Sequence, residues 1–432
     1  MREKVLRAAD RVRLPTGRRG GVALAAVGVC LFVSSLVLGA ALAPDIGAAG
    51  STDTPRTLVG SQGGGPGLHE KGSVYLLDGR EIAWRANGTD SYFDVTKLPN
   101  GSVVAGFMDG GYTDCGPYAS PCVHTGFRII DPNAESAADP AIVSEYSFPV
   151  RTRKNSEVHD VEPLDSGGFL LTDMEYERIF VVEGGEVVWQ WNASSIYEAP
   201  PDPTTTDWLH INDVDVLSEG RYLVSVRNAN QLVIVERGEG VVEVINEDED
   251  GDGRGDPAVL RQQHNPQWLG NGTVLVADSH NDRIVELTRT ESGEWEVAWA
   301  LYRTEGVRFN WPRDADRLPN GNTLITDSLN KRIVVVNRTG AAVWSYQTPQ
   351  VPYEADRLPA GEPVGGVSYA TGERTTIGSD GDVPVLSFFL VVLQTGLQTP
   401  FWFTEVHVAI GLVSLGCVLG GVVVALRTGP PE

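Results

Sequence analysis

Three of the chain's seven histidines occur in short motifs together with residue types that could act on an anionic group. These motifs, including one that carries an arginine, are Val158-His159-Asp160, His210-Ile211-Asn212, Ser225-Val226-Arg227 and Gln263-His264-Asn265. A histidine that is uncharged near neutral pH is a nucleophile, and an arginine is a permanently charged fork for two oxygen atoms. Asparagine and further imidazoles can donate hydrogen bonds to the same oxygens. The motifs therefore indicate group transfer at a histidine, a chemistry that requires no metal.

An internal repeat of six units positions these motifs along the chain. Each unit starts with an acidic or polar residue, has a leucine four positions later, and continues through a turn into a short run of β-favouring residues. The units start at Asp94, Asp160, Asp213, Asn265, Asp314 and Glu354. Turns such as Pro99-Asn100-Gly101 are typical of β-hairpins. Four short strands per unit predict an all-β fold, a six-bladed β-propeller over residues 68–375.

The last unit soon runs into glycine-rich sequence, so its outer strands must come from elsewhere in the chain. Residues 73–84 resemble residues 332–344, which form the outer hairpin of the fifth unit. We therefore predict that the N-terminal part of the chain completes the last blade, which closes the ring and removes exposed strand edges. A β-sandwich is the alternative, but it does not require a six-fold repeat.

The innermost strand of a blade lines the central channel, so the residue just before the start of each unit is expected near the axis. The residues at this position are Phe93, His159, Asn212, His264, Arg313 and Tyr353, and His210 lies two residues before Asn212. Histidines with only structural roles would be scattered, whereas these occupy equivalent places in three consecutive units. The clustering favours a functional site, although His159 alone would suit a core position and Arg227 alone a surface ion pair.

The same motifs resemble those of the aryl-sulfate sulfotransferases, a family of six-bladed propeller enzymes, most specifically between residues 159 and 265. The resemblance implies PAPS-independent transfer of a sulfuryl group from an aryl sulfate to a phenolic acceptor through a transient sulfohistidine. By motif, the sulfohistidine falls on His264, and the other catalytic positions fall on His210, Asn212, Arg227 and His159. Such a transfer is helped by positive and hydrogen-bonding groups around the spreading oxygen charge and requires no cofactor. This chain differs from better-known members in its two apolar segments, its shorter blade insertions and the lack of an evident extra N-terminal β-domain.

Three other functions stay open on the residues alone. A non-catalytic propeller of the NHL-repeat kind would bind a protein or glycan at the membrane surface, but it has no need of three histidines, an asparagine and an arginine at blade starts. Imidazole is a common zinc ligand, so the three histidines could hold a divalent metal instead. A quinone-dependent dehydrogenase propeller is the third alternative, and the regular tryptophan motifs of that group are not evident in the sequence.

An acidic loop precedes the last histidine motif and resembles a calcium-binding loop. Its carboxylates alternate with glycines and lie at Asp248, Asp250, Asp252 and Asp256. An EF-hand would carry a glutamate where this chain has Val259, so the match is incomplete. A structural calcium ion and a solvated acidic loop without an ion are both consistent with the pattern.

Two apolar segments, residues 21–43 and 406–426, are each long enough to span the hydrocarbon core of a bilayer. Basic residues predominate before the first segment, so the positive-inside rule predicts cytoplasmic chain ends and an extracytoplasmic propeller at the cell membrane. The resulting order is a basic tail over 1–20, a transmembrane helix over 21–43, a linker over 44–67, the propeller over 68–375, an interfacial linker over 376–405, a second transmembrane helix over 406–426 and a tail over 427–432. A cleaved signal peptide is the alternative for the first segment, because Ala41-Leu42-Ala43 imitates a cleavage site.

The composition is strongly acidic, with 57 aspartate and glutamate residues against 34 lysine and arginine residues. This excess argues against nucleic acid as a partner, because nucleic acid requires a basic surface. It suits a halophilic prokaryote, in which high ionic strength screens the repulsion between carboxylates. Cys115 and Cys122 fall on the external side, where a disulfide between them would persist, and two free thiols are the alternative. The sequence does not indicate an oligomeric state.

Overall fold

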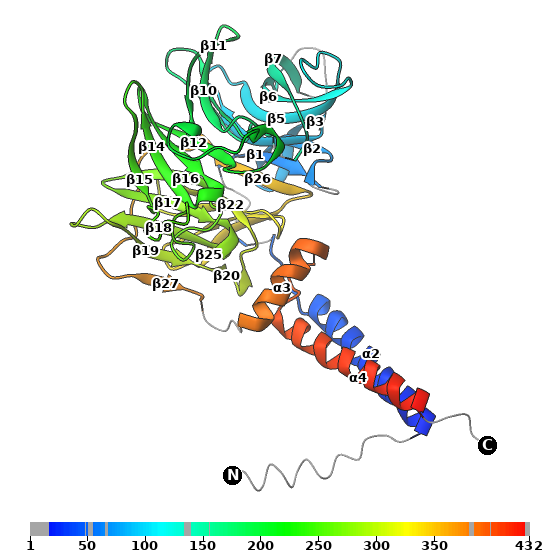
Figure 1. The fold of residues 1–432 in the computed structure, drawn as a ribbon. Coiled ribbons are helices and arrows are strands. Elements are labelled where there is room, and N and C mark those ends of the chain that lie inside the picture. Colours follow the sequence, from blue (N-terminus) through cyan, green and yellow to red (C-terminus); the bar gives the residue numbers. More distant parts are fainter. Residues whose placement is uncertain are drawn as a thin grey trace. The chain divides into compact units, whose positions relative to one another are not determined.

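The computed structural model describes residues 17–47, 49–50, 55–64, 68–133, 140–154, 156–379, 384–397 and 399–427. These residues belong to two compact units, one within residues 45–379 and the other made by parts of the two chain ends. The larger unit is a six-bladed β-propeller, as the repeat predicts, and its blades are antiparallel sheets (Figure 1).

Five of the blades are formed by strands that follow one another in the sequence, from the inner strand outwards. Blade one contains β4 (Ser91–Lys97), β5 (Val103–Tyr112), β6 (Cys122–Asp131) and β7 (Ala141–Val150), and blade two contains β8 (Val161–Pro163), β9 (Phe169–Asp173), β10 (Arg178–Glu183) and β11 (Glu186–Asn192). Blade three contains β12 (Ile211–Ser218), β13 (Arg221–Val226), β14 (Gln231–Glu236) and β15 (Gly240–Ile245). Blade four contains β16 (His264–Gly270), β17 (Thr273–Asp278), β18 (Arg283–Arg289) and β19 (Trp295–Leu301), with β27 (Thr375–Ile377) added parallel to β19. Blade five contains β22 (Pro312–Arg317), β23 (Thr323–Asp327), β24 (Arg332–Val336) and β25 (Ala342–Gln347), and the short hairpin of β20 (Arg303–Thr304) and β21 (Val307–Arg308) precedes it.

The sixth blade is shared by the two ends of the propeller, which confirms the predicted closure. Its inner strand is β26 (Val351–Arg357), and its outer strands are β1 (Thr57–Gly63), β2 (Gly72–Asp78) and β3 (Glu81–Thr89). Figure 1 shows β26 beside β1, although these strands lie at opposite ends of the propeller sequence. The predicted linker over 44–67 is therefore wrong from Thr57 onwards. The strand β1 pairs with its sequence neighbour β2 on one side and with β26, a segment far along the chain, on the other.

Apolar side chains on both faces of each blade pack against the neighbouring blades. For example, Ile179 and Val181 of β10 belong to one cluster with Val224 and Val233 of blade three. Because each blade is covered on both faces, strands such as β17 and β24 are buried along their whole length. Burial of one such aliphatic side chain contributes about 1.5–3 kcal/mol. This packing makes the ring of blades a scaffold that can hold side chains at its axis.

The first residue of the repeat joins neighbouring blades at the channel wall. Asp94 Oδ2 accepts a hydrogen bond from the backbone N–H of Val161 at 3.1 Å, and Asp314 Oδ2 accepts one from Ala355 at 3.1 Å. In both pairs the donor is the second residue of the next repeat, and Asp160 makes the same kind of contact. A buried backbone N–H needs an acceptor, so this contact explains the acidic residue at the start of these three units.

The smaller unit contains two helices that are long and apolar enough to span a membrane, α2 (Gly17–Ala41) and α4 (Glu405–Arg427). Their backbones approach closely at small residues, because a β-carbon on Gly21 would lie 2.4 Å from the carbonyl oxygen of Gly421. The helix α3 (Pro384–Leu397) has 14 residues, too few to span a bilayer. Which side of a membrane the propeller occupies stays a prediction. The predicted tails lie outside the described residues, except for 17–20 and 427.

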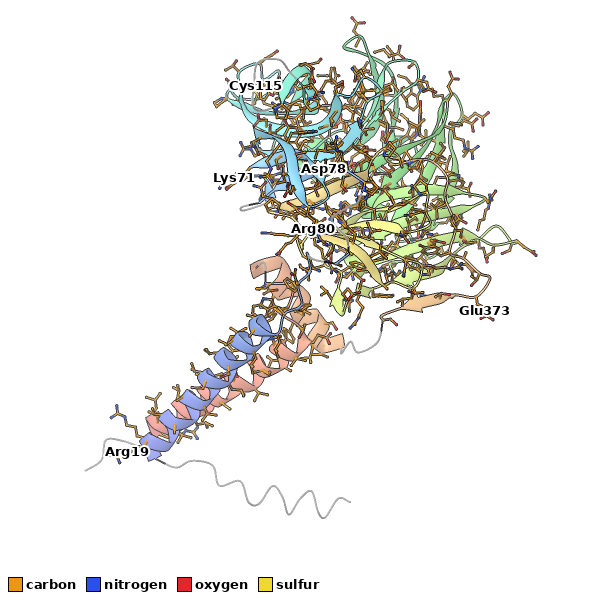
Figure 2. All side chains as sticks on the ribbon, turned by 180° about the vertical axis from the view of Figure 1, so that it is seen from behind. Arg19, Lys71, Asp78, Arg80, Cys115 and Glu373 are labelled. Atoms are coloured by element: carbon orange, nitrogen blue, oxygen red, sulfur yellow. A yellow bond between two sulfur atoms is a disulfide. The ribbon has the colours of Figure 1, made fainter. Side chains whose placement is uncertain are left out.

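Cys115 and Cys122 form a disulfide, as predicted, with their Cα atoms 5.7 Å apart. The bridge closes the loop between β5 and β6, and Figure 2 shows Cys115 near the outer edge of blade one. The other two cysteines, Cys30 and Cys417, are free.

Candidate active site at the propeller axis

In five blades the inner strand has a β-bulge at or beside the residue expected at the axis. In blade three, Ile211 and Asp213 pair with the consecutive residues Val226 and Ser225, so Asn212 between them is unpaired. The inner strands of four other blades have a similar irregularity, around Phe93, Asn265, Arg313 and Tyr353. A bulge adds one residue to a strand and re-aims its side chain, and bulges are frequent beside active sites.

Five of the six predicted axial residues come together. The ring centroid of His159 lies 4.9 Å from that of Phe93 and 5.3 Å from that of Tyr353. The Tyr353 ring centroid also lies 6.2 Å from that of His264 and 5.1 Å from the guanidinium carbon of Arg313. Side chains from blades one, two, four, five and six therefore meet at one place, as the repeat predicts.

His264 is held in one tautomer by a hydrogen bond at Nδ1. This nitrogen lies 2.7 Å from Ser279 Oγ, and Ser279 Oγ lies 2.7 Å from the carbonyl oxygen of Pro312. A hydroxyl group has one proton and a carbonyl group can only accept, so the proton of Ser279 points to a carbonyl. Nδ1–H of His264 then donates to Ser279, which leaves the lone pair of the neutral ring on Nε2. A nucleophilic histidine would react through this nitrogen.

Cationic groups surround His264 in this otherwise acidic protein. Burial lowers the pKa of His264 well below its usual value, and the charges of Arg227 and Arg313 lower it further. The imidazole is therefore neutral, and nucleophilic, at neutral pH. Burial also lowers the pKa of Arg313 to about 10, which still leaves this guanidinium charged at neutral pH. The site thus combines a neutral nucleophile with fixed positive charge.

His210 is oriented by Asp207 and lies against Arg227. Its Nδ1 is 2.8 Å from Asp207 Oδ1 and 3.2 Å from Arg227 Nη1. An arginine N–H and an imidazole N–H are both donors, so the shorter contact with the carboxylate identifies Nδ1–H of His210 as a donor to Asp207. Arg227 in turn donates to Asn228 Oδ1 at 2.9 Å. His210 therefore has Nε2 free for proton transfer.

The backbone at His210 is held in a left-handed conformation by a buried carboxylate. The φ angle of His210 is 56°, which is unusual for a residue with a side chain. Glu177 accepts hydrogen bonds from the backbone N–H groups of Leu209, His210 and Ile211, at 2.9, 2.7 and 2.9 Å. Glu177 lies in blade two, so a neighbouring blade positions the histidine of blade three.

His159 lies between other rings of the site. Its centroid is 5.2 Å from that of His210, and the two rings are nearly parallel. Burial lowers the pKa of His159 well below its usual value, although the carboxylate of Glu157 opposes this shift. In the described part of the chain, Nδ1 of His159 has no hydrogen-bond partner. This nitrogen is therefore available to a substrate atom.

Two residues beside His159 were not singled out from the sequence, Glu157 and His69. His69 Nε2 lies 3.2 Å from Glu157 Oε1. Burial raises the pKa of Glu157, but the hydrogen bond from His69 and the electrostatic effect of the neighbouring imidazoles outweigh it and lower this pKa to about 2. Glu157 lies two residues before His159, so its place on the same side of an extended strand could have been inferred. His69 lies outside the repeat, and no sequence signal connects it with the site.

Asn212 positions the backbone next to the candidate nucleophile. It is fully buried, and its Nδ2 donates to the carbonyl oxygen of Gln263 at 2.9 Å. Of the five predicted site residues, His159, His210 and Arg227 form a chain of contacts, and all three act electrostatically on His264. The fifth, Asn212, holds the strand that carries His264.

The acidic loop that was predicted to bind calcium brings together three of its four carboxylates. Oxygen atoms of Asp248, Asp250 and Asp252 lie within 4.8 Å of one another at the surface, and Asp256 is not part of this group. The oxygens of Asp248 already accept backbone N–H groups of the loop, for example that of Gly253 at 2.8 Å. Calcium binding by this loop stays a prediction.

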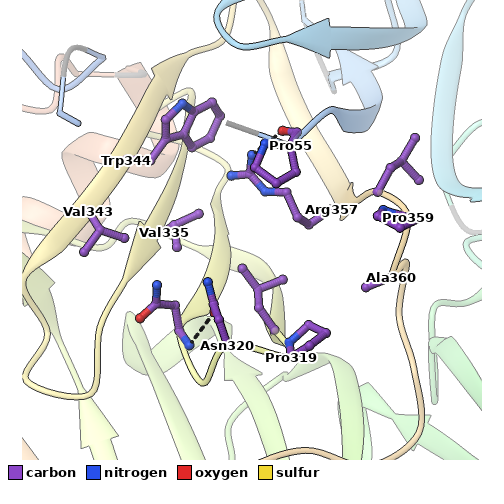
Figure 3. Close-up of a pocket in the computed structure, with 12 residues that line it drawn as sticks. Pro55, Pro319, Asn320, Val335, Val343, Trp344, Arg357, Pro359 and Ala360 are labelled. Carbon is purple, nitrogen blue, oxygen red and sulfur yellow. Dashed lines mark hydrogen bonds between the residues drawn. The ribbon is translucent and has the colours of Figure 1, made fainter. Parts of the chain in front are cut away.

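A separate cavity of about 300 Å³ lies between blades five and six (Figure 3). Its lining includes Leu318 and Pro359, which follow the ends of the inner strands β22 and β26. The guanidinium carbon of Arg357 lies over the Trp344 ring there, 4.4 Å from its centroid. The axial histidines and arginines lie at the opposite ends of the inner strands, and none of them lines this cavity.

No protein-family model matches the chain, and no curated protein matches it. Among solved structures, a protein of unknown function from Bacteroides caccae is similar, with a TM-score of 0.46 and 16% sequence identity, and the match covers 69% of this chain and 94% of that one. The periplasmic gluconolactonase of Pseudomonas aeruginosa matches with a TM-score of 0.41 and 13% identity, over 70% of this chain and 98% of that one. Virginiamycin B lyase of Staphylococcus aureus matches with a TM-score of 0.37 and 12% identity, over 69% and 81%. These are distant neighbours, and identities this low say nothing about activity.

Proposed function

We propose that the protein is an aryl sulfotransferase that moves a sulfuryl group from an aryl sulfate to a phenolic acceptor. The observation that carries this proposal is the state of His264, because Ser279 occupies its Nδ1 and leaves the lone pair on Nε2. The charge of Arg227, which lowers the pKa of this imidazole, is the second support. A neutral nitrogen beside fixed positive charge suits attack on a sulfur atom that carries anionic oxygens.

In the first step, the lone pair of His264 Nε2 attacks the sulfur atom of the aryl sulfate. The N–S bond forms while the bond between sulfur and the aryl oxygen breaks, and the aryl oxide leaves with the bonding electrons. Arg227 and Arg313 stabilise the negative charge on the remaining sulfuryl oxygens. The aryl oxide leaves as the anion and takes its proton from solvent, and the sulfohistidine remains.

His210 is the better placed of the other two histidines to act as the base of the second step. Burial and Arg227 lower the pKa of His210 and outweigh the opposing hydrogen bond with Asp207, so the ring is neutral at neutral pH, and Asp207 orients it. His159 has no such carboxylate partner on Nδ1, so it acts as a neutral ligand of the substrate. In the second step, the acceptor phenol gives its proton to His210 and attacks the sulfur, and the N–S bond breaks to regenerate His264.

The first test is sulfuryl transfer from 4-nitrophenyl sulfate to phenol by the detergent-solubilised full-length protein at high salt. The wild type should release nitrophenol only when phenol is present, and His264→Ala should lower turnover at least about 10³-fold. His280→Ala is the matched control, because His280 is an exposed histidine in the turn after β17. It should keep wild-type turnover.

The covalent intermediate gives a second readout. Incubation with 4-nitrophenyl sulfate without an acceptor, followed by an alkaline quench, should add the mass of one sulfuryl group to the peptide that carries His264. A folded wild type that turns over none of a panel of aryl sulfates would refute the enzyme proposal. The non-catalytic, NHL-like propeller would then be the better description of the protein.

A further inference from the structure

Beyond the histidines, a second ring of acidic side chains lies along the inner strands. The third residue of each repeat points to the same side of its strand as the first, because side chains alternate along a strand. In blades two, three, five and six this third residue is Glu162, Asp215, Asp316 or Asp356. Asp215, Asp316 and Asp356 are buried, and Glu162 is partly buried. The repeat therefore concentrates four carboxyl groups at one level of the channel.

Glu362 adds a further carboxyl group from the loop that follows β26. This loop starts in blade six and is bonded to blade four, where the carbonyl oxygen of Pro363 accepts from Gln267 Nε2 at 3.0 Å. Two residues later, the backbone N–H of Gly365 donates to the carbonyl oxygen of Trp268 at 2.7 Å. These bonds hold the loop against blade four. They place Glu362 near carboxylates of the ring.

Three of these carboxylates converge on one point. Oxygen atoms of Glu162, Asp215 and Glu362 all lie within 4.8 Å of one another. Oδ2 of Asp215 has no hydrogen-bond partner among the described residues, although the residue is only 7% exposed. Oδ1 of Asp316 and Oδ1 of Asp356 lack partners in the same way, and each residue is 2% exposed. Buried carboxylate oxygens without partners are costly, so this ring needs either protons or a cation.

The electrostatics of the ring favour the same conclusion. Burial raises the pKa of Glu362, and the neighbouring carboxylate of Asp316 raises it further. The pKa of Asp215 is likewise raised by burial and by Asp160. A group of carboxylates that repel one another in this way attracts a cation strongly, because a cation relieves the repulsion and allows them to ionise.

We propose that Ca²⁺ binds at this point on the propeller axis, coordinated by Glu162, Asp215 and Glu362. Calcium takes hard oxygen ligands at about 2.4 Å, so two ligands on opposite sides of the ion are about 4.8 Å apart. Three oxygens within 4.8 Å of one another lie at most about 2.8 Å from a common point, so a small rotation of the side chains brings all three onto one ion. Glu162 and Glu362 are only partly buried, which leaves room for water ligands. The ion links blades two and three to the loop of blade six.

This site differs from the exposed acidic loop at Asp248. The carboxylates of that loop accept backbone N–H groups, whereas Asp215 has a buried oxygen without a partner among the described residues. The proposal is also independent of the proposed sulfuryl transfer, because it concerns cation binding and stability rather than turnover. An inactive protein that binds Ca²⁺ on the axis, or an active one that does not, would separate the two proposals.

The test is Ca²⁺ binding by the detergent-solubilised full-length protein after treatment with EDTA, measured by calorimetric titration together with thermal unfolding. The wild type should bind Ca²⁺ and unfold at a higher temperature in its presence. Glu362→Gln should weaken this binding at least about tenfold, because it removes one of three charged ligands. Asp250→Asn and Glu373→Gln are the controls, since Asp250 lies in the exposed acidic loop and Glu373 is exposed before β27 (Figure 2).

Weaker binding in Glu362→Gln, with wild-type binding in both controls, would support the axial site. Three outcomes would overturn it: no Ca²⁺ binding by the wild type, unchanged binding by Glu362→Gln, or loss of binding in Asp250→Asn alone. If Glu362→Gln does not fold, Glu162→Gln replaces it with the same expected loss. A further readout is pH, because the ligands must be deprotonated and Ca²⁺ affinity should therefore rise with pH.

Discussion

Nδ1 of His264 lies 2.7 Å from Ser279 Oγ, and this contact decides which nitrogen of the imidazole carries the lone pair. Ser279 follows β17 of blade four, and its hydroxyl proton is directed at the carbonyl oxygen of Pro312 at the start of blade five. The state of the candidate nucleophile therefore depends on a contact between two blades.

Ser279→Ala should lower kcat about 10- to 100-fold, because His264 loses the acceptor that fixes its tautomer and orientation. Ser279 is a positioning residue, so Ser279→Thr, which keeps the hydroxyl group, should recover most of the activity. Steady-state kinetics with an aryl sulfate donor measure both variants, and thermal unfolding reports whether they fold. Equal losses in the alanine and threonine variants would contradict this role.

Arg227→Ala should lower kcat/KM for an aryl sulfate about 10²- to 10³-fold, because a buried fixed charge at the sulfuryl oxygens is removed. Arg227→Lys keeps the charge but loses the planar fork, so its activity should lie between those of the wild type and Arg227→Ala. The measurement is kcat/KM for all three proteins. Wild-type activity in Arg227→Ala would exclude the residue from the site.

The rate of sulfuryl transfer should persist well below pH 6.5. Burial, Arg227 and Arg313 lower the pKa of His264, so the ring stays neutral and nucleophilic at pH values where an exposed histidine is protonated. The acidic limb of kcat/KM against pH reports this pKa. A limb centred at or above pH 6.5 would show that His264 is not in the state that the structure indicates.

In the presence of EDTA, the free energy of unfolding should fall as pH rises from 5 to 8. Burial raises the pKa of Asp314 to about 7 and that of Asp282 to about 6, whereas unfolded aspartate titrates near 3.9. The folded state thus binds more protons than the unfolded state. The resulting contribution to the free energy of unfolding is fully present below about pH 4 and is lost as pH rises through 6 and 7. Each carboxyl should account for at least about 1 kcal/mol of this fall in the free energy of unfolding, which is measured from urea unfolding curves.

Asp314→Asn is the control for this pH dependence. It removes one titrating group, so the fall in stability between pH 5 and 8 should be smaller than in the wild type. A stability that rises over this interval in EDTA would contradict the raised pKa values.

Asp314→Ala should destabilise the propeller by about 1–3 kcal/mol, because the buried backbone N–H of Ala355 and the hydroxyl of Thr326 lose their acceptor. Asp314→Asn retains an acceptor oxygen, so at pH 5 it should lower the free energy of unfolding less than Asp314→Ala does. Urea unfolding of the two variants at that pH gives the comparison. An equal loss in both would mean that the contact between blades five and six does not depend on this oxygen.

Much of the propeller could be predicted because its repeat carries the information locally. The acidic residue and the leucine of each unit mark the inner strand, and the residue before the unit falls at the axis, as Phe93, Arg313 and Tyr353 show. The strand β1 lies before the first unit of the repeat, and it pairs with β2 on one side and with the distant β26 on the other, so the repeat did not predict it. His69 was missed for the same reason, since it reaches Glu157 from blade six.

By itself, the sequence determined the number of blades, the shared last blade, the two long apolar helices and the residue types at the axis. These features follow from periodicity, and periodicity is a property of neighbouring residues. Only the tertiary structure decided that Ser279 occupies Nδ1 of His264 and that Asp207 orients His210. It also brought Glu362 from a loop to the carboxylates of the inner strands. Such contacts join residues that are far apart in the sequence and follow no periodicity. They therefore form only when the ring of blades closes.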